Sequence, residues 1–289
     1  MLSINNSVTS LNAQRHLSRA TGNLGKTFAR LASGMRINSS RDDAAGMAIV
    51  NRMVAQVRGM NMAVRNANDG ISLAQVAESA LDETTNALQR ARELMVQAAN
   101  STYSSGDRKN LQDEVVQMLS EVQRIATTTQ FNEINLLTGS YSGNNFHVGA
   151  DANQTIMFSI RAASLVALGV SMGGNGTATT LGSFGLGRTT AAAQSVLNSN
   201  LAKIDNALDS ISDIRSNLGA VMSRFETVIA SLSNVIENTD AARSRIQDAD
   251  IATETAALTR NTILQQAGVA ILAQANQQPT IALQLLSLK

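Results

Sequence analysis

Residues 197–236 read LNSNLAKIDNALDSISDIRSNLGAVMSRFETVIASLSNVI, and their apolar side chains recur in alternating steps of four and three from Leu197 to Ile236. This spacing places the side chains along one face of an α-helix and is typical of helices that pack as coiled coils. One charged residue, Arg215, interrupts the face. Forty helical residues extend about 60 Å, so the stretch predicts one long helix with long helical neighbours.

The residues before this stretch supply such neighbours. Apolar periodicity predicts one helix through Ile49–Ala98 and another through Leu111–Ile125, separated by a loop at Asn100–Asp107. The triplet Asn68–Gly70 normally indicates a turn. Because the apolar period resumes beyond it, we expect this triplet to lie inside the helix.

The middle of the chain changes character after Thr127. Alternating segments at Phe146–Gly149 and Thr155–Ile160, bounded by Gly, Asn and Asp, predict a β-hairpin. The following Met172–Thr190 is rich in Gly, Thr and Ser and predicts a surface connection. The fold class is therefore mainly α, a long antiparallel helical bundle or coiled coil with a small β-hairpin region in the middle.

An N-terminal helix is predicted before Ser33-Gly34, where the periodicity breaks. Its apolar seam consists of Ala13, Leu17, Ala20, Leu24, Phe28, Leu31 and Met35. Four basic residues fall together on the opposite side of the helix: Arg15, Arg19, Lys26 and Arg30. A solvated face is the simplest interpretation of this basic stripe, with a negatively charged neighbour or a polar channel as the alternative. Asp42 and Asp43 are expected to cap the next helix.

The C-terminal tail, Ile251–Lys289, has an unusual composition. Asn261–Leu288 contains no Asp, Glu, Lys or Arg, and its apolar residues point to most sides of a helix. A helix of this kind needs neighbours on most sides. Its longest run without polar side chains, Gly268–Ala273, is far below the roughly 20 residues of a membrane span. The N-terminal helix Ala13–Met35 supplies one neighbour, and other copies of the chain must supply the rest.

Composition and motifs argue against several functions. A net charge of +1 disfavours nucleic acid as the main partner, and the chain has no cysteine for disulfides or thiol chemistry. His16 and His147 are isolated, and Gly173–Gly176 lacks the Lys-Ser/Thr of a phosphate loop. No cofactor, metal site or enzyme is predicted. The first residues lack a secretory signal, so any export is expected to need no cleaved signal.

Several motifs make the chain resemble the bacterial flagellin family. The resemblance covers residues 1–165 and 190–289, and the middle is shorter than in larger flagellins. The motifs are Leu31–Asn38, Arg41–Gly46, Arg65–Ser72, Thr129–Asn132, Gln247–Asp250, Glu254–Arg260 and Ile263–Gly268.

The resemblance implies two domains and a polymer. Residues 1–41 with 246–289 would form a terminal coiled coil in the inner tube of a flagellar filament, and residues 42–245 a surrounding helical domain. Residues 162–190 would be a short variable connection in place of outer domains. Inner-tube packing would involve Leu17, Leu24, Phe28, Leu31, Leu264, Ile271 and Leu272. The basic residues Arg15, Arg19, Lys26 and Arg30 would face the channel or a neighbouring subunit.

The resemblance also implies an export route and a set of partner proteins. It would be exported unfolded by the flagellar type III apparatus to an extracellular flagellum used for motility. Implied partners are other copies of the chain, an export chaperone on the C-terminal segment, the filament cap and the hook–filament junction proteins. Neither nucleic acid nor membrane insertion is implied.

A further implied partner is the vertebrate innate receptor for flagellin. Gln89–Gln97 resembles the receptor-activating version, with Arg90 and Leu94 one turn apart and Glu114 on the next helix. Ala91 and Met95 differ from the commonest version. The alternative interpretation is that Leu94 is a core residue and Arg90 a solvated or intersubunit charge.

Two other functions fit parts of the sequence. A hook–filament junction protein would share the architecture, but the tail motif and the receptor-type segment are characteristic of flagellin itself. A coiled-coil type III secretion effector would explain the heptads but not the paired, charge-poor ends.

Overall fold

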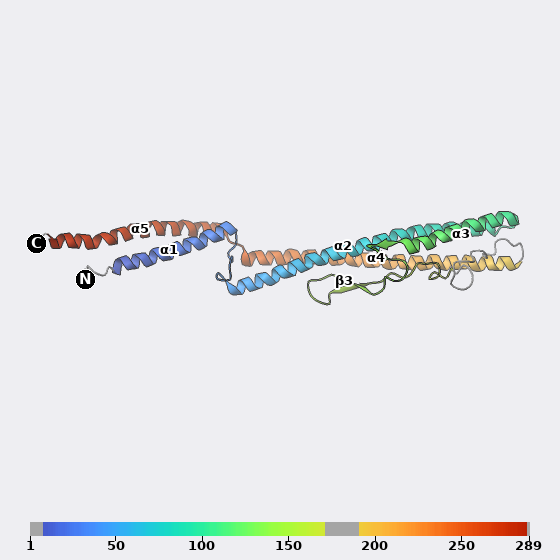
Figure 1. The fold of residues 1–289 in the computed structure, drawn as a ribbon, viewed down its shortest axis with the longest axis horizontal. Coiled ribbons are helices and arrows are strands. Elements are labelled where there is room, and N and C mark those ends of the chain that lie inside the picture. Colours follow the sequence, from blue (N-terminus) through green and yellow to red (C-terminus); the bar gives the residue numbers. More distant parts are fainter. Residues whose placement is uncertain (1–7, 171–190, 288–289) are drawn as a thin grey trace. The chain divides into compact units, whose positions relative to one another are not determined.

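A computed structural model describes residues 8–170 and 191–287, and its helices form two compact units. One unit comprises Met1–Val57 and Glu237–Lys289, and the other comprises Arg58–Ile236. The described residues form the helices α1 (Val8–Ser33), α2 (Ala44–Ala98), α3 (Ser105–Thr128), α4 (Ala191–Gln247) and α5 (Ile251–Ser287). Helices α2 and α4 each contribute residues to both units (Figure 1).

The hydrophobic core of the unit Arg58–Ile236 lies among α2, α3 and α4. Its largest fully buried aliphatic side chains include Leu81 and Leu88 of α2, Leu119 of α3 and Ile204 of α4. Arg92 of α2 pairs with Asp205 of α4 at 2.6 Å, and Arg215 of α4 pairs with Glu78 at 2.8 Å. Since the residue numbers rise on one helix as they fall on the other, α2 and α4 run antiparallel.

A small aromatic cluster explains the glycine in Asn68–Gly70. The rings of Phe146 and Phe225 meet edge to face, with centroids 5.5 Å apart. A Cβ atom on Gly70 would lie 3.0 Å from the Phe225 ring and 3.3 Å from the Phe146 ring. The triplet lies inside α2, as predicted, and its glycine leaves room for the buried Phe225 ring and the half-buried Phe146 ring.

Two antiparallel hairpins follow α3. The predicted hairpin is confirmed as β3 (Asn144–His147) paired with β4 (Thr155–Phe158). A shorter hairpin pairs β1 (Gln130–Phe131) with β2 (Ile134–Asn135), and its turn places Asn132 and Glu133 at φ 48° and 65°. The sequence interpretation missed this hairpin because two-residue strands show no alternation.

The segment after β4 is part of the core. Ala163, Leu165, Leu168 and Val170 are each at most 5% exposed and pack with α2, α3 and α4. The first residues of the predicted variable connection are therefore packed into the hydrophobic core. The rest of that connection, including all of Met172–Thr190, lies outside the described residues.

The other unit is built on an antiparallel pair of α1 and α5, which run side by side in Figure 1. Near one end Ser10 donates to the Asn276 side chain at 2.8 Å. Gly268 lies against Leu17, where an added Cβ would approach the Leu17 Cδ1 atom to 3.3 Å. The small glycine thus lets the two helix backbones approach closely.

Two connecting segments within this unit pair with each other. Gly34, at φ 69°, ends α1 as the predicted break requires, and Met35 forms an isolated antiparallel bridge with Asp248. The Arg36 guanidinium donates to the Ile246 carbonyl at 2.6 Å. Asp43 accepts from the Gly46 backbone N–H at 2.9 Å and so caps α2, as expected.

The fold class is confirmed, and three local predictions are corrected. Helix α3 begins at Ser105, inside the expected loop, because Ser104 and Asp107 form a capping box. Helix α4 continues to Gln247, beyond the periodic stretch. Arg215 lies beside the buried row rather than in it, and Ile214, 3% exposed, occupies the core position.

Candidate assembly and recognition surfaces

The α1–α5 pair buries one face of each helix and leaves apolar side chains on the others. Most residues of α5 that are at least partly covered follow a heptad: Glu254, Leu258, Asn261, Gln265, Gly268, Leu272 and Ala275, with Ala257 and Thr262 beside this row. Outside this row Ile263 is 58% exposed, Leu264 52% and Ile271 58%. A helix with this much exposed apolar surface is not satisfied by its single partner.

Phe28 lies outside the α1–α5 seam, which corrects the register predicted for α1. Thr27, 6% exposed, is buried against α5, whereas Phe28 is 66% exposed. The seam continues from Leu24 through Thr27 to Leu31, in steps of three and four. Asn261 donates to the Thr27 hydroxyl at 3.3 Å, and this polar contact replaces the apolar one that the sequence suggested.

The basic residues of α1 do not share one environment. Arg19 and Lys26 are exposed, and Arg15, also exposed, donates to Asn12 at 2.5 Å. Arg30 instead faces α5, where its guanidinium lies 3.5 Å from Glu254. The predicted placement of all four opposite the seam is thus wrong for Arg30 and for Lys26, which lies beside the α5 helix, because the seam passes through Thr27 and shifts the buried face.

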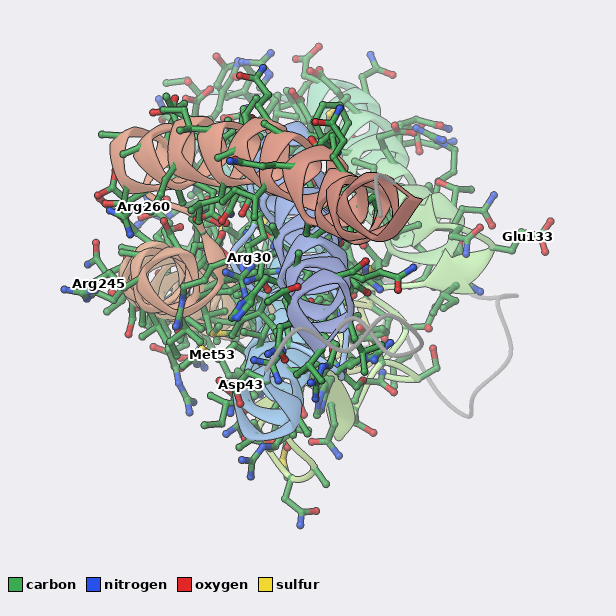
Figure 2. All side chains as sticks on the ribbon, turned by 90° about the vertical axis from the view of Figure 1, so that its left-hand side faces the viewer. Arg30, Asp43, Met53, Glu133, Arg245 and Arg260 are labelled. Carbon is green, nitrogen blue, oxygen red and sulfur yellow. The ribbon has the colours of Figure 1, made fainter. Side chains whose placement is uncertain are left out.

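A pocket of about 380 Å³ opens between α1 and α5 at this position. Three cationic side chains line it, Lys26, Arg30 and Arg260, together with one carboxylate, Glu254. Figure 2 labels Arg30 on α1 and Arg260 on α5. Glu254 and Arg260 bound one of the family motifs and are the two charged residues of α5, but the sequence pattern gives no sign that they meet Arg30.

The three residues of the predicted recognition site divide between surface and core. Arg90 donates to Glu114 at 3.1 Å and to Glu93 at 3.2 Å, and its side chain is 53% exposed. Hydrogen bonds to Glu114 and then Glu93 raise the pKa of Arg90. The site therefore presents a fixed, fully charged guanidinium on α2 beside a carboxylate on α3.

Leu94 belongs to the core. It is 1% exposed and packs within the apolar cluster of α2, α3 and α4. Ala91 and Met95, the two departures from the commonest flagellin version, are also fully buried. A partner approaching this face meets Arg90, Glu93 and Glu114, whereas the three buried side chains only position them.

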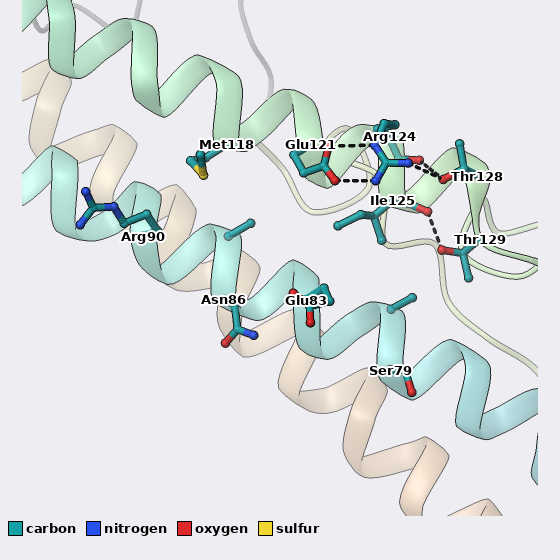
Figure 3. Close-up of a pocket in the computed structure, with 12 residues that line it drawn as sticks. Ser79, Glu83, Asn86, Arg90, Met118, Glu121, Arg124, Ile125, Thr128 and Thr129 are labelled. Carbon is teal, nitrogen blue, oxygen red and sulfur yellow. Dashed lines mark hydrogen bonds and ion pairs between the residues drawn. The ribbon is translucent and has the colours of Figure 1, made fainter.

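An open groove of about 600 Å³ runs between α2 and α3 beside Arg90. Figure 3 shows Arg90 and Met118 toward one end of the groove and Ser79 and Thr129 toward the other. Arg124 pairs with Glu121 across one turn of α3. The groove combines charged side chains with the apolar surface of Met118, a mixture typical of protein contacts rather than of a catalytic cavity.

Neither a metal centre nor a membrane span occurs in the described ranges. No group of three His, Asp or Glu side chains within residues 8–170 and 191–287 is arranged to hold a metal ion. Over the same residues, no helix combines the length and apolar character needed to cross a bilayer.

The sequence matches two family models. The bacterial flagellin N-terminal helical region matches residues 4–142, and the bacterial flagellin C-terminal helical region matches residues 201–286. These matches include α1, α2 and α3 at one end and most of α4 and α5 at the other.

Relatives that match over nearly their whole length strengthen the match. Flagellin FlaB1 of Treponema pallidum is 41% identical over 283 residues, covering 94% of this chain and 96% of that protein. Flagellin B of Vibrio cholerae is 35% identical over a longer alignment of 373 residues, covering 99% of each chain. The chain is therefore similar in length to the Treponema protein and shorter than the Vibrio protein.

A solved structure supports the fold. A putative flagellar hook-associated protein from Vibrio parahaemolyticus superposes with a TM-score of 0.60 at 12% identity, covering 72% of this chain and 100% of that chain. At this identity the likeness concerns the fold alone. The two family matches and the full-length relatives show that the chain belongs to the bacterial flagellin family, and that it is a structural subunit of the extracellular flagellar filament rather than an enzyme.

Proposed function

We propose that the α1–α5 pair is completed by the terminal helices of neighbouring copies, which together form the inner tube of the filament. Exposed apolar side chains on both helices carry this proposal, above all Phe28 on α1 and Ile271 on α5. Burying them against other copies removes apolar surface from water, which stabilises the assembly by about 25 cal/mol per Å² of buried surface. The residues assigned to inner-tube packing divide accordingly: Leu17, Leu24, Leu31 and Leu272 join α1 to α5, and Phe28, Leu264 and Ile271 join copies.

Polymerisation of a truncated chain tests this proposal. Purified protein is heated, cooled with filament seeds and observed by electron microscopy, and the full chain is expected to form long filaments. A chain that ends at Arg260 is expected to keep the circular dichroism of a helical protein while forming no filaments. Filament growth by the truncated chain would show that α5 is dispensable, contrary to the proposal.

Export in an unfolded state through the flagellar type III apparatus accompanies this function. The chain has no cysteine, so no disulfide has to be broken or re-formed during passage. Immunoblots of culture supernatants from cells with and without the export apparatus test the route. Equal secretion by both strains would contradict it.

We infer that the other partner proteins bind the same exposed surfaces of the terminal helices α1 and α5. Before assembly, the exposed apolar residues of α5 need cover, and an export chaperone bound to Ile251–Lys289 provides it. The filament cap and the hook–filament junction proteins contact the same terminal helices at the two ends of the polymer. Co-purification of a chaperone with the full chain but not with the chain ending at Arg260 is the expected result.

The exposed group of Arg90, Glu93 and Glu114 supports a second proposal, recognition of the monomer by the vertebrate innate flagellin receptor. Arg90 is partly exposed, held by two carboxylates and placed at the end of a groove. Arginine anchors of this type often dominate protein interfaces. Ala91 and Met95 are buried, so their departures from the commonest version change no exposed contact.

A matched pair of arginine substitutions tests receptor recognition. Arg90→Ala is expected to lower signalling by monomer in receptor-bearing reporter cells by about tenfold, the effect of a single interface anchor. Arg92→Ala is the control, because Arg92 lies two residues away, has similar exposure and pairs with Asp205. Equal potency of the Arg90→Ala protein and the parent would remove the proposal.

A further inference from the structure

The pocket between α1 and α5 has an excess of positive charge that its own chain does not balance. Lys26, Arg30 and Arg260 line it, and Glu254 is the carboxylate among its lining residues. Glu254 is also the one acidic residue of α1 and α5 together. At neutral pH the pocket therefore carries about two unbalanced positive charges from these residues.

The one ion pair inside the pocket is incomplete. The Arg30 Nη1 atom lies 3.5 Å from the Glu254 Oε1 atom, longer than the 2.7–2.9 Å usual for a charge-assisted hydrogen bond. The Arg30 Nε atom is shielded from solvent and has no acceptor among the described residues. A guanidinium N–H that is shielded without an acceptor is costly, so a further acceptor beside Glu254 would stabilise the site.

Apolar side chains border the pocket. Phe28 follows Thr27 on α1, and Ile263 and Leu264 lie one turn after Arg260 on α5, where residues three and four apart are neighbours. All three are more than half exposed. A small anion from solution would leave this apolar border in water, whereas a protein surface that carries an acidic side chain would cover both.

We propose that this pocket binds an acidic side chain of a second copy of the chain, and that the resulting ion pair fixes the register between neighbouring copies. This inference rests on the proposed assembly through α1 and α5. Because Glu254 is the one acidic residue of α1 and α5, the acidic side chain comes from a part of the second copy outside its terminal helices, where the other 21 of the 22 acidic residues lie. A charge pair that is desolvated in an interface selects one alignment, since other alignments leave the cations unpaired.

Zero-length cross-linking in filaments tests the contact directly. A water-soluble carbodiimide joins a lysine amine to a carboxylate in contact with it, and Lys26 is one of four lysines in the chain, with Lys109, Lys203 and Lys289. Filaments are grown from a mixture of nitrogen-15-labelled and unlabelled chains. Mass spectrometry is expected to find Lys26 joined to an Asp or Glu of a chain with the other label, and the peptide identifies that residue.

Two outcomes of the cross-linking would overturn the proposal. In one, filaments form but Lys26 is joined only within single chains. In the other, inorganic phosphate protects Lys26 of the monomer and no link between chains appears in filaments, which assigns the pocket to a small anion. If the parent chain forms no filaments at all, the assembly proposal itself fails, and that result is visible by electron microscopy before any cross-linking.

Charge variants provide an independent measurement. Arg260→Gln is expected to raise the critical concentration for polymerisation about tenfold, the loss of one interfacial ion pair, and Arg260→Lys to restore most of it. Arg161→Gln is the matched control, since Arg161 is an exposed arginine outside α1, α5 and the pocket. An unchanged critical concentration for Arg260→Gln, with monomer circular dichroism like that of the parent, would overturn the proposal.

Discussion

Replacing a helical glycine by alanine is expected to change the stability of this protein in opposite directions at two positions, Gly70 and Gly219. Gly70 of α2 lies against Phe225, which is fully buried, whereas an added Cβ on Gly219 of α4 meets nothing within 4 Å. In an open helical position alanine is more favourable than glycine by about 1 kcal/mol. In a filled position, overpacking costs about 1–3 kcal/mol.

We therefore expect Gly219→Ala to stabilise the monomer by about 0.5–1 kcal/mol, from the helical preference of alanine alone. Gly70→Ala is expected to destabilise it by about 1 kcal/mol or more, because the Phe225 ring is held by Phe146 and Phe158 and has little room to shift. Urea unfolding followed by circular dichroism measures both. A stabilised Gly70→Ala protein would show that the ring moves away at small cost.

Arg215 gives a second prediction at the scale of the residue. It pairs with Glu78 at 2.8 Å and Asp82 at 3.1 Å, and the hydrogen bond to Glu78 is the main cause of its raised pKa. A double-mutant cycle with Arg215→Met and Glu78→Gln is expected to give a coupling energy of about 1 kcal/mol in urea unfolding, since the groups are only partly exposed.

The matched cycle uses the more exposed pair Arg92 and Asp205, with Arg92→Met and Asp205→Asn. Solvent screens this pair more strongly, so its coupling is expected to stay below about 0.5 kcal/mol. Equal couplings for the two pairs would mean that burial does not strengthen the Arg215 contact.

At the scale of the element, the start of α3 depends on a titrating cap. Asp107 accepts hydrogen bonds from the Ser104 hydroxyl at 2.7 Å and from the Ser104 backbone N–H at 3.1 Å. These bonds lower the pKa of Asp107 from its ordinary value. Because the folded state binds this proton less tightly than the unfolded state, the cap stabilises α3 above pH of about 4 and is lost as pH falls through the lowered pKa.

We expect Asp107→Asn to destabilise the monomer at pH 6 and the difference from the parent to shrink as pH falls below about 4. Unfolding free energies measured across this range test the expectation. Asp113→Asn is the control, because Asp113 is exposed in the middle of α3 and caps nothing. If the difference in unfolding free energy between Asp107→Asn and the parent did not change with pH, the stabilisation by the cap would not depend on the ionisation of Asp107.

At the scale of the whole molecule, the chain keeps part of its apolar surface for other copies. Phe28 is 66% exposed, whereas Leu24 on the same helix is half-buried against α5. Phe28→Ser is expected to change the unfolding free energy of the monomer by less than about 0.5 kcal/mol, as for other surface substitutions, and to raise the critical concentration for polymerisation.

Leu24→Ser provides the contrast, because it removes a contact inside the α1–α5 pair. This variant is expected to lower the helical content of the monomer as well as its polymerisation. Sedimentation of filaments after seeded growth, together with circular dichroism of monomers, distinguishes the two effects. Polymerisation of the Phe28→Ser protein at the parent's critical concentration would show that Phe28 makes no contact between copies.

The sequence alone determined the long helices, the break at Gly34, the hairpin of β3 and β4, and the family. Periodic apolar residues report the face of a helix directly, because burial of that face is what stabilises the helix. The same periodicity placed Asn68–Gly70 inside α2, against the local turn signal. Long, repetitive elements were therefore predictable.

Only the tertiary structure decided which of two adjacent rows on a helix is buried. Thr27 is buried rather than Phe28, and Ile214 rather than Arg215. Arg30 faces Glu254, and Leu94 is buried whereas Arg90 is exposed. Adjacent positions on a helix differ by about 100°, so a heptad pattern alone admits either row. Which row is buried depends on the partner helix. Asn261 donates a hydrogen bond to Thr27, and Glu78 and Asp82 pair with Arg215, and the sequence of one helix shows neither contact.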